Sequence, residues 1–349
     1  MHMSDALVST PVALTMGTIS ILLIAAAIKR IHSEGEHHQV ALMGVMGAFI
    51  FAAQMINFSI PGTGSSGHIV GGILLASLLG AWRGFIVLTS IIIVQCLIFA
   101  DGGLLALGCN IINMAAFTCL VAYPLLFHPL SGGHFPFKRL LLASVTACVV
   151  GLELGAFAVS IETSMSNITA LSFTHFLLFM LGIHFVVGIC EGVATAGVLF
   201  FIQKSMPEAF IQFSISDANN SDILCKENKI RSDNKKAFYI LLTGALIIAA
   251  SFSWIASSHP DGLEWSILQT QEYSSNIVSE ISPQETDIQE ESIVSMPQSV
   301  QQKTAILADY AHSTDGIIGV IIMLTVVWGG SVLFIHLRKH YASSRKSHL

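Results

Sequence analysis

The chain has 349 residues, of which 53% are hydrophobic and 11% are charged, and its formal net charge is -6. Soluble globular domains carry about 25% charged residues. This composition, with a mean hydropathy of +0.71, therefore excludes a soluble protein and predicts a polytopic membrane protein. The six cysteines contain no CxxC pair, which argues against a disulfide framework or a thiolate metal cluster.

Apolar runs long enough to cross a membrane, about 17–25 residues each, can be placed nine times along the chain. They lie at residues 11–28, 38–58, 66–82, 84–100, 104–127, 139–161, 170–203, 237–257 and 316–337. With the N-terminus outside, every lysine and arginine except Lys303 falls on the cytoplasmic side, as the positive-inside rule expects. The predicted fold class is an all-α polytopic membrane protein with its N-terminus outside and its C-terminus inside.

Composition divides the chain into three parts. Residues 1–205 are predicted to form a bundle of seven spans with short loops, and residues 206–236 are polar and charged, as in a cytoplasmic linker. Residues 237–349 then form two further spans around an acidic external segment. Whether residues 272–291 of that segment bind metal is left open by the sequence.

A glycine-rich loop, Pro61-Gly-Thr-Gly-Ser-Ser-Gly-His68, separates two apolar runs in the first half of the chain. Glycines let bare backbone pack against helices, so the loop can fold inward and carry His68 towards the N-terminus. The loop contains GxGxxG, but it lacks the βαβ context of a dinucleotide site. The chain also contains no GxxxxGK[ST] motif, so ATP-driven transport would need another subunit.

The first two residues, Met1 and His2, offer three nitrogen donors to one metal ion: the α-amine, the His2 amide and the His2 ring. The ordinary pKa of the amine, about 7.7–8.0, allows a metal to displace its proton near neutral pH. A deprotonated amide suits square-planar Ni(II), low-spin Co(II) or Cu(II). His68 is the natural fourth ligand. The alternative is that His2 lies in a frayed, solvated terminus.

Other polar residues are candidates for support rather than ligation. Side chains that could hold His68 or the loop in place are Ser66, Asn57, Gln95, Asn110 and Asn113. Ionisable residues inside spans are costly, and Glu153, His184 and Glu191 are candidates for an intramembrane polar network, either functional or structural. Gly188 and Gly192 would let that helix face approach another helix closely. An intramembrane enzyme is least favoured, because no nucleophile accompanies these residues, and no catalytic residue is predicted.

Several motifs in order resemble the CbiM/NikM family, whose members are substrate-binding (S) components of energy-coupling-factor transporters for cobalt or nickel. The motifs are Met1-His2-Met-Ser-Asp5, Gln54-Met-Ile-Asn57-Phe, Pro61-Gly-Thr-Gly-Ser-Ser-Gly-His68, Gln95-Cys-Leu-Ile-Phe-Ala-Asp101 and Leu107-Gly-Cys-Asn110-Ile-Ile-Asn113. The resemblance covers about residues 1–200. It implies that the amino terminus lies within the bundle and that the metal is held by the Met1 amine, the His2 amide and ring, and His68.

This sequence departs from the family pattern at two places. Met-Ser-Asp-Ala follows His2 where Ile-Pro-Asp-Gly is frequent, and Thr10 stands where a proline is common. Neither change removes a ligand.

The second part of the chain carries a resemblance of its own. His259-Pro-Asp261-Gly-Leu-Glu264 resembles the PDGLE motif of CbiN/NikN-type accessory subunits, so the chain is similar to a fused M–N protein. The resemblance implies Ni(II) or Co(II) as transported substrate, no organic cofactor and a place in the bacterial cytoplasmic membrane. It also implies a transmembrane coupling (T) subunit and cytoplasmic ATPase subunits as partners. The alternative function is a copper-binding membrane protein using Met1, His2, Met3 and helix methionines.

Overall fold

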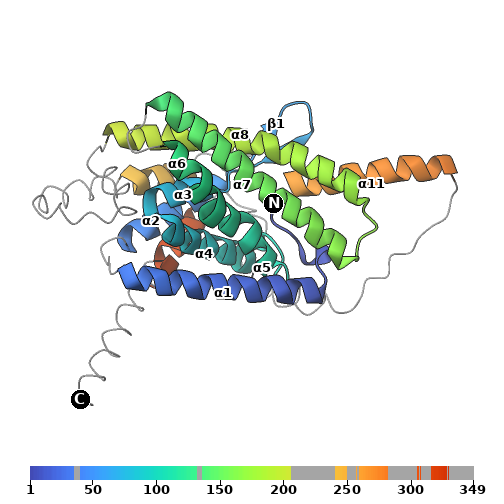
Figure 1. Ribbon diagram of the computed structural model, residues 1–349, viewed down its shortest axis with the longest axis horizontal. Coiled ribbons are helices and arrows are strands. Elements are labelled where there is room, and N and C mark those ends of the chain that lie inside the picture. The colour runs from blue at the N-terminus through green and yellow to red at the C-terminus, as the bar shows by residue number, and fades with distance from the viewer. Residues whose placement is uncertain are drawn as a thin grey trace, which may run out of the picture.

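The computed structural model describes residues 1–34, 40–131, 136–205, 240–249, 257, 259–281, 305, 307, 316–327 and 329. Within these ranges the chain is mostly helical (Figure 1). The first half contains η1 (Asp5–Leu7), α1 (Thr10–Glu34), α2 (Val40–Gln54), β1 (Phe58–Ile60), β2 (Ser65–Gly67), α3 (Gly72–Leu79) and α4 (Ala81–Phe99). The remainder contains α5 (Leu107–Asn110), η3 (Ile111–Phe127), α6 (His128–Ser131), α7 (Phe137–Ser166), α8 (Phe173–Ser205) and α11 (Gly262–Ile281).

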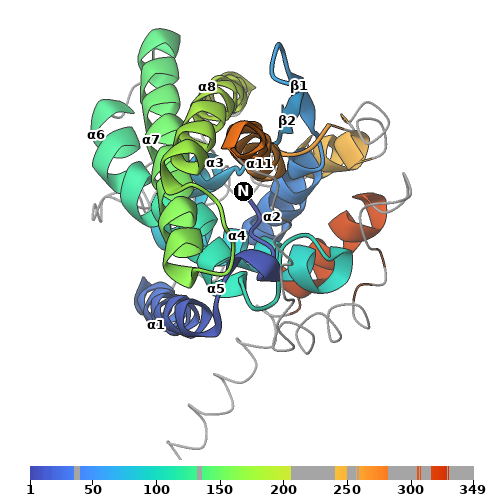
Figure 2. The same cartoon turned by 90° about the vertical axis from the view of Figure 1, so that its right-hand side faces the viewer.

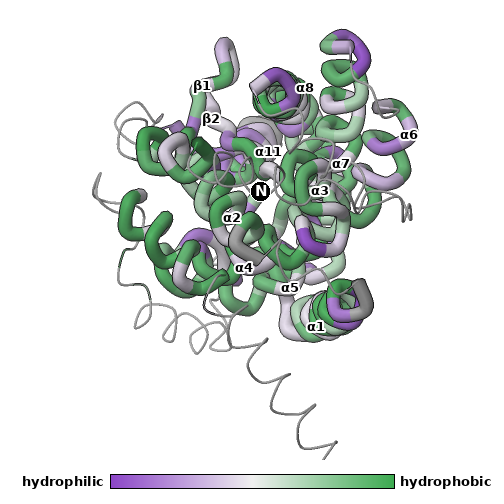
Figure 3. Tube along the Cα trace, turned by 90° about the vertical axis from the view of Figure 1, so that its left-hand side faces the viewer, coloured by the Kyte–Doolittle hydropathy of each residue, from purple (hydrophilic) through white to green (hydrophobic). Residues whose placement is uncertain are grey.

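Five helices of the described residues are long and apolar enough to cross a membrane. They cover Thr10–His32, Ala81–Phe99, Leu107–Ser131, Phe137–Ser166 and Phe173–Ser205. The third of these joins α5, the π-helical segment η3 and α6 into one rod. Most of the helical residues are hydrophobic (Figure 3), and many large hydrophobic side chains are exposed on the outside of the bundle, as lipid contact requires. The predicted helical, multi-pass membrane fold is confirmed, with the short antiparallel hairpin β1–β2 as its only described sheet.

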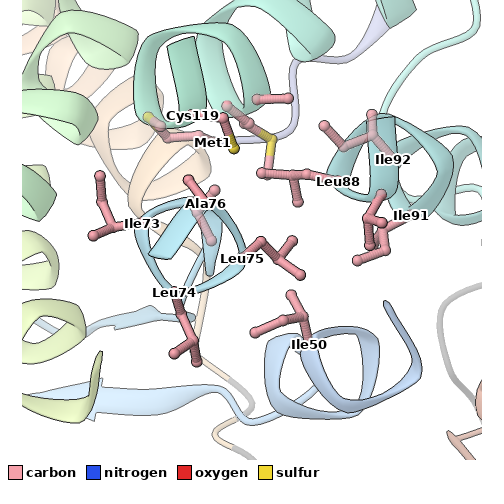
Figure 4. Close-up of a cluster of buried hydrophobic side chains, with 14 of the residues drawn as sticks. Met1, Ile50, Ile73, Leu74, Leu75, Ala76, Leu88, Ile91, Ile92 and Cys119 are labelled. Carbon is pink, nitrogen blue, oxygen red and sulfur yellow. The ribbon is translucent and has the colours of Figure 1, made fainter. Parts of the chain in front are cut away.

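The span predicted over residues 66–82 is wrong. This run forms β2 and then α3, whose eight residues reach about 12 Å at 1.5 Å per residue, against a hydrocarbon core of about 30 Å. Gly71 and Gly80, with φ of 79° and 83°, bound α3 at its two ends. The helix instead fills the interior: Ile73 and Leu75 are fully buried, and Leu75 points into the space between α3, Ile50 of α2 and Leu88 of α4 (Figure 4).

Two other expectations fall largely outside the described residues. The predicted spans 237–257 and 316–337 are represented by the shorter apolar helices Ile240–Ala249 and Gly316–Val327. The predicted linker 206–236 lies wholly outside the residues that the structure describes. The start of the acidic segment is helical, since α11 continues to Ile281.

Small residues allow α7 and α8 to pack closely. A Cβ added at Gly188 would lie 2.8 Å from Val149 Cα, and one added at Gly192 would lie 2.9 Å from the Val145 nitrogen. The predicted close approach along this face of α8 is therefore confirmed. It fixes α8 against α7 beside the centre of the molecule.

Candidate metal centre

The first residues of the chain run into the helical bundle. Figure 2 shows the N-terminus at the centre of the molecule, close to α11 and β2. The Met3 backbone donates to Asn110 Oδ1 at 2.7 Å and accepts from Asn110 Nδ2 at 3.2 Å. Asp5 Oδ1 accepts the backbone N–H groups of Leu105 and Ala106 at 2.7 and 3.1 Å. These hydrogen bonds hold residues 3–5 against the segment 105–110, so the amino terminus is not frayed.

The side chain of Met1 anchors the α-amine. It lies in an apolar cluster beside Cys119 (Figure 4) and is buried. Gly155 of α7 makes room for it, because a Cβ at that position would lie 2.9 Å from Met1 Cε. Hydrophobic packing thus holds the Met1 amine at a defined point inside the protein.

The amine, the His2 ring and the His68 ring lie together at this point. The rings of His2 and His68 are stacked, with centroids 5.4 Å apart and planes 21° from parallel. The Met1 amine is 3.3 Å from Asp261 Oδ2, and His2 Nδ1 is 3.1 Å from Asp101 Oδ1. A chelate through the amine, the amide and Nδ1 therefore requires the His2 ring to turn away from Asp101.

Both imidazoles are suited to donate lone pairs. Burial, followed by the positive charges of the Met1 amine and of His2, lowers the pKa of His68 to about 4. Burial also lowers the pKa of His2, against the opposing charge of Asp101. His68 Nδ1 lies 3.1 Å from the Ile69 carbonyl oxygen, which can only accept a hydrogen bond. Nδ1 therefore carries the proton, and the lone pair of Nε2 is left to bind a metal.

A buried carboxylate holds the backbone just after His68. Glu191 of α8 accepts the Val70 N–H at 2.7 Å through Oε2 and the Gly71 N–H at 2.9 Å through Oε1. Val70 is held from its other side by Gln54 Nε2, which donates to its carbonyl at 2.7 Å. Gln95 Nε2 donates in turn to Gln54 Oε1 at 2.9 Å. The loop is thus fixed to α8, α2 and α4.

The remaining candidates for support fall into two groups. Asn110 and Asn113 act on the N-terminal segment: Asn113 Nδ2 donates to Glu162 Oε2 at 2.7 Å and contacts Met3 Sδ at 3.8 Å. Ser66 and Asn57 instead contact the second part of the chain. Ser66 Oγ donates to the His259 carbonyl at 2.8 Å, and the Asn57 carbonyl accepts the Ser257 N–H at 2.8 Å.

The three ionisable residues predicted inside spans make separate contacts. His184 Nδ1 lies 2.8 Å from the Met180 carbonyl, whereas Glu191 binds the loop backbone. Glu153 is half-buried, and its Oε1 has no hydrogen-bond partner among the described residues. The hydrogen bonds of the described residues therefore do not join Glu153, His184 and Glu191 into one network.

Sequence reasoning missed four residues around the centre: Gln54, Asp101, Glu162 and Asp261. Each contacts a group far away in the chain, which spacing cannot reveal. Asp261 did carry one signal, because Asp261-Gly-Leu-Glu264 has the pattern of a helix-capping box. No group of three or more His, Cys, Asp or Glu side chains in the described part of the chain forms a metal site. The candidate centre instead depends on backbone nitrogens.

Comparison with known proteins places the chain in a family. Residues 2–209 match the CbiM model, described as "Cobalt uptake substrate-specific transmembrane region". The chain belongs to the CbiM family. Residues 235–336 match the PDGLE domain, so the predicted fusion of the two units is confirmed.

Relatives and solved structures agree with this assignment. A putative metal transport protein of Haloquadratum walsbyi is 35% identical over 62% of this chain and 97% of that protein. A putative fused nickel transport protein NikMN of Archaeoglobus fulgidus is 34% identical over 61% of this chain and 68% of that protein. A crystal structure of a transition metal transporter aligns with a TM-score of 0.53 and 29% identity, over 61% of this chain and 98% of that one.

The comparisons confirm two predictions about the whole protein. It is a multi-pass membrane protein of a transport family rather than an enzyme. CbiM-family proteins are components of transporters and function with partner subunits.

Proposed function

We propose that this protein is the substrate-binding component of an energy-coupling-factor transporter that imports Ni(II) or Co(II). The ligands are the Met1 amine, the His2 amide and ring, and His68 Nε2. One observation carries the proposal: the buried Met1 amine, the buried His2 imidazole and the half-buried His68 imidazole meet inside the bundle. A buried amine is costly unless a partner compensates it, and together with the His2 amide these groups make the donor set that square-planar Ni(II) prefers.

Metal capture requires a small rearrangement of the donors. The His2 ring turns its Nδ1 away from Asp101, and the amine and the His2 amide each lose a proton to water as the metal binds. His68 Nε2 then takes the fourth position in the plane. Nickel is favoured over cobalt because fused relatives, such as the one from Archaeoglobus fulgidus, bear nickel transport names.

The connection between the loop and α8 supports a route for release. Glu191 joins the backbone beside His68 to α8 through two hydrogen bonds, so displacing α8 would withdraw His68 from the other ligands. We propose that the partners are a transmembrane coupling subunit and cytoplasmic ATPases, since the sequence contains no GxxxxGK[ST] motif. The predicted N-out orientation would place capture on the external side.

No observation favours the copper alternative. Met43, Met46 and Met114 lie in the apolar core, and Met55 packs against it. The Met3 sulfur contacts Asn113 Nδ2 at 3.8 Å. These thioethers fill space in the interior, which is the ordinary use of methionine.

The ligand set is tested by His2→Ala and His68→Ala in the full-length protein with its native N-terminus. Each change removes a donor, so nickel affinity should fall by more than about 100-fold, beyond the usual cost of losing an outer partner of a ligand. His128→Ala, in α6, is the matched control and should bind as the unchanged protein does. Nickel content after gel filtration and thermal unfolding give binding and folding separately. Tight binding by both ligand variants would reject this site.

A further inference from the structure

The PDGLE segment, defined here as residues 259–265, lies directly on the glycine-rich loop. The Ser66 N–H donates to the Pro260 carbonyl at 2.8 Å, and Ser66 Oγ donates to the His259 carbonyl at 2.8 Å. Trp265 Nε1 donates to the Thr63 carbonyl at 2.8 Å. Two regions about 200 positions apart are thus joined beside His68, and Figure 2 shows α11 next to both β2 and the N-terminus.

Asp261 and Glu264 form a capping box at the start of α11. The Glu264 N–H donates to Asp261 Oδ1 at 2.8 Å, and the Asp261 N–H donates to Glu264 Oε2 at 3.4 Å. In such a box each side chain satisfies a backbone donor of the first turn. The cap occupies Oδ1 and leaves Oδ2 directed at the Met1 amine, 3.3 Å away. Helix geometry therefore aims this carboxylate at the candidate metal ligand.

Gly262 and Leu263, the two residues between Asp261 and Glu264, let the start of α11 lie close to α8 and the core. A Cβ at Gly262 would lie 3.2 Å from Ile183 Cγ2 and 3.3 Å from His184 Cε1, so even alanine there would press on side chains of α8. Leu263 is buried in the core. Pro260, Gly262 and Leu263 thus each have a contact that holds the start of α11, and with it Asp261, beside the amine.

We propose that Asp261 is a positioning residue of the metal site, which keeps its contact with the Met1 amine after the metal has bound. This inference rests on the proposed function. A coordinated primary amine retains two N–H bonds, so Asp261 Oδ2 can accept one of them and fix the direction of the nitrogen lone pair. A divalent metal with one deprotonated amide carries a single net positive charge, which Asp261 balances beside the buried amine. The PDGLE domain thus completes the metal site of the CbiM-like bundle.

The charge of Asp261 is tested by Asp261→Asn in the full-length protein. Asparagine also caps helices well, so α11 keeps its cap while the negative charge beside the amine is lost. Glu264→Gln is the matched control, because it alters the same capping box without touching the amine. Measurements are nickel stoichiometry, the ligand-field absorption of the nickel complex, and the rate at which EDTA removes nickel.

The proposal predicts that Asp261→Asn still binds one nickel ion with unchanged absorption, since the ligands are the same. Affinity should fall by about 10–100-fold and release should accelerate by a similar factor, which is typical for loss of an outer partner of a ligand. Glu264→Gln should match the unchanged protein. Asp261→Ser, a second uncharged cap, provides the same test if the asparagine variant folds poorly.

Two results would overturn the proposal. Unchanged affinity and release in Asp261→Asn would make Asp261 a helix cap only, and loss of the absorption band would make it a direct ligand. Absence of nickel and cobalt binding in the unchanged protein would instead reject the proposed function on which the inference rests.

Discussion

The amine of Met1 and the ring of His2 are each held by a carboxylate that is distant in the chain. The partner of Met1 is Asp261, at a separation of 260 positions, and the partner of His2 is Asp101. The sequence predicts the donors themselves, because an N-terminal His2 and a histidine in a glycine-rich loop are distinctive. It does not predict the carboxylates, because only the fold brings them to the donors.

Glu191 is expected to control the position of His68. In Glu191→Gln one amide N–H₂ would face a backbone N–H of the loop, leaving a buried donor unpaired at a cost of about 1–3 kcal/mol. We expect nickel affinity to fall by about 10-fold and the metal-free protein to unfold at lower temperature. Glu153→Gln is the control, since its Oε1 has no hydrogen-bond partner in the described structure. Equal affinities in the two variants, measured by nickel titration, would contradict this role.

Among the elements, α3 shows most clearly where sequence reasoning fails. Residues 66–82 are as apolar as a membrane span. The first of these residues, however, belong to the loop that folds inward, and glycines end α3 on both sides. Hydropathy reports that a segment avoids water, and it does not distinguish lipid from the protein interior. The long spans α1, α4, α7 and α8 were predictable because each apolar run is long enough to cross a membrane, about 17–25 residues.

Gly71 is the point at which the loop turns into α3. Alanine at this position would have to adopt a φ of 79°, which side chains disfavour, and its Cβ would lie 2.7 Å from Ile50 Cγ2. Gly62, with a φ of 80° and open space around it, is the matched control for the backbone cost alone, about 1–2 kcal/mol. We expect Gly62→Ala to bind nickel normally, whereas Gly71→Ala should lose more stability and weaken binding. Thermal unfolding and nickel titration would refute this if the two variants behaved alike.

The pairing of α7 with α8 should be equally sensitive to a single methyl group. Gly192→Ala would press on the backbone of Val145, and we expect it to destabilise the protein by about 1–3 kcal/mol. Gly197→Ala, on the same helix and with open space around it, should change stability little. Thermal unfolding in detergent compares the two. A stable Gly192→Ala variant would show that the contact between the helices is not tight.

For the whole molecule, the candidate centre joins residues from the N-terminus, the glycine-rich loop and the PDGLE segment. Metal binding should therefore stabilise the chain as one unit, by about 2.7 kcal/mol at a free nickel concentration of 100 times Kd. Thermal unfolding with and without nickel measures this shift, and His68→Ala should abolish it. An equal shift in that variant would show that nickel stabilises the protein from another place.

The most direct test of the account compares nickel binding by the protein with its native N-terminus and by a form with one extra N-terminal residue. The extension preserves every side chain but moves the α-amine away from the His2 ring. We predict a yellow, diamagnetic one-to-one nickel complex in the native form and its loss in the extended form. Equal binding by both forms would contradict the amine–amide–imidazole site.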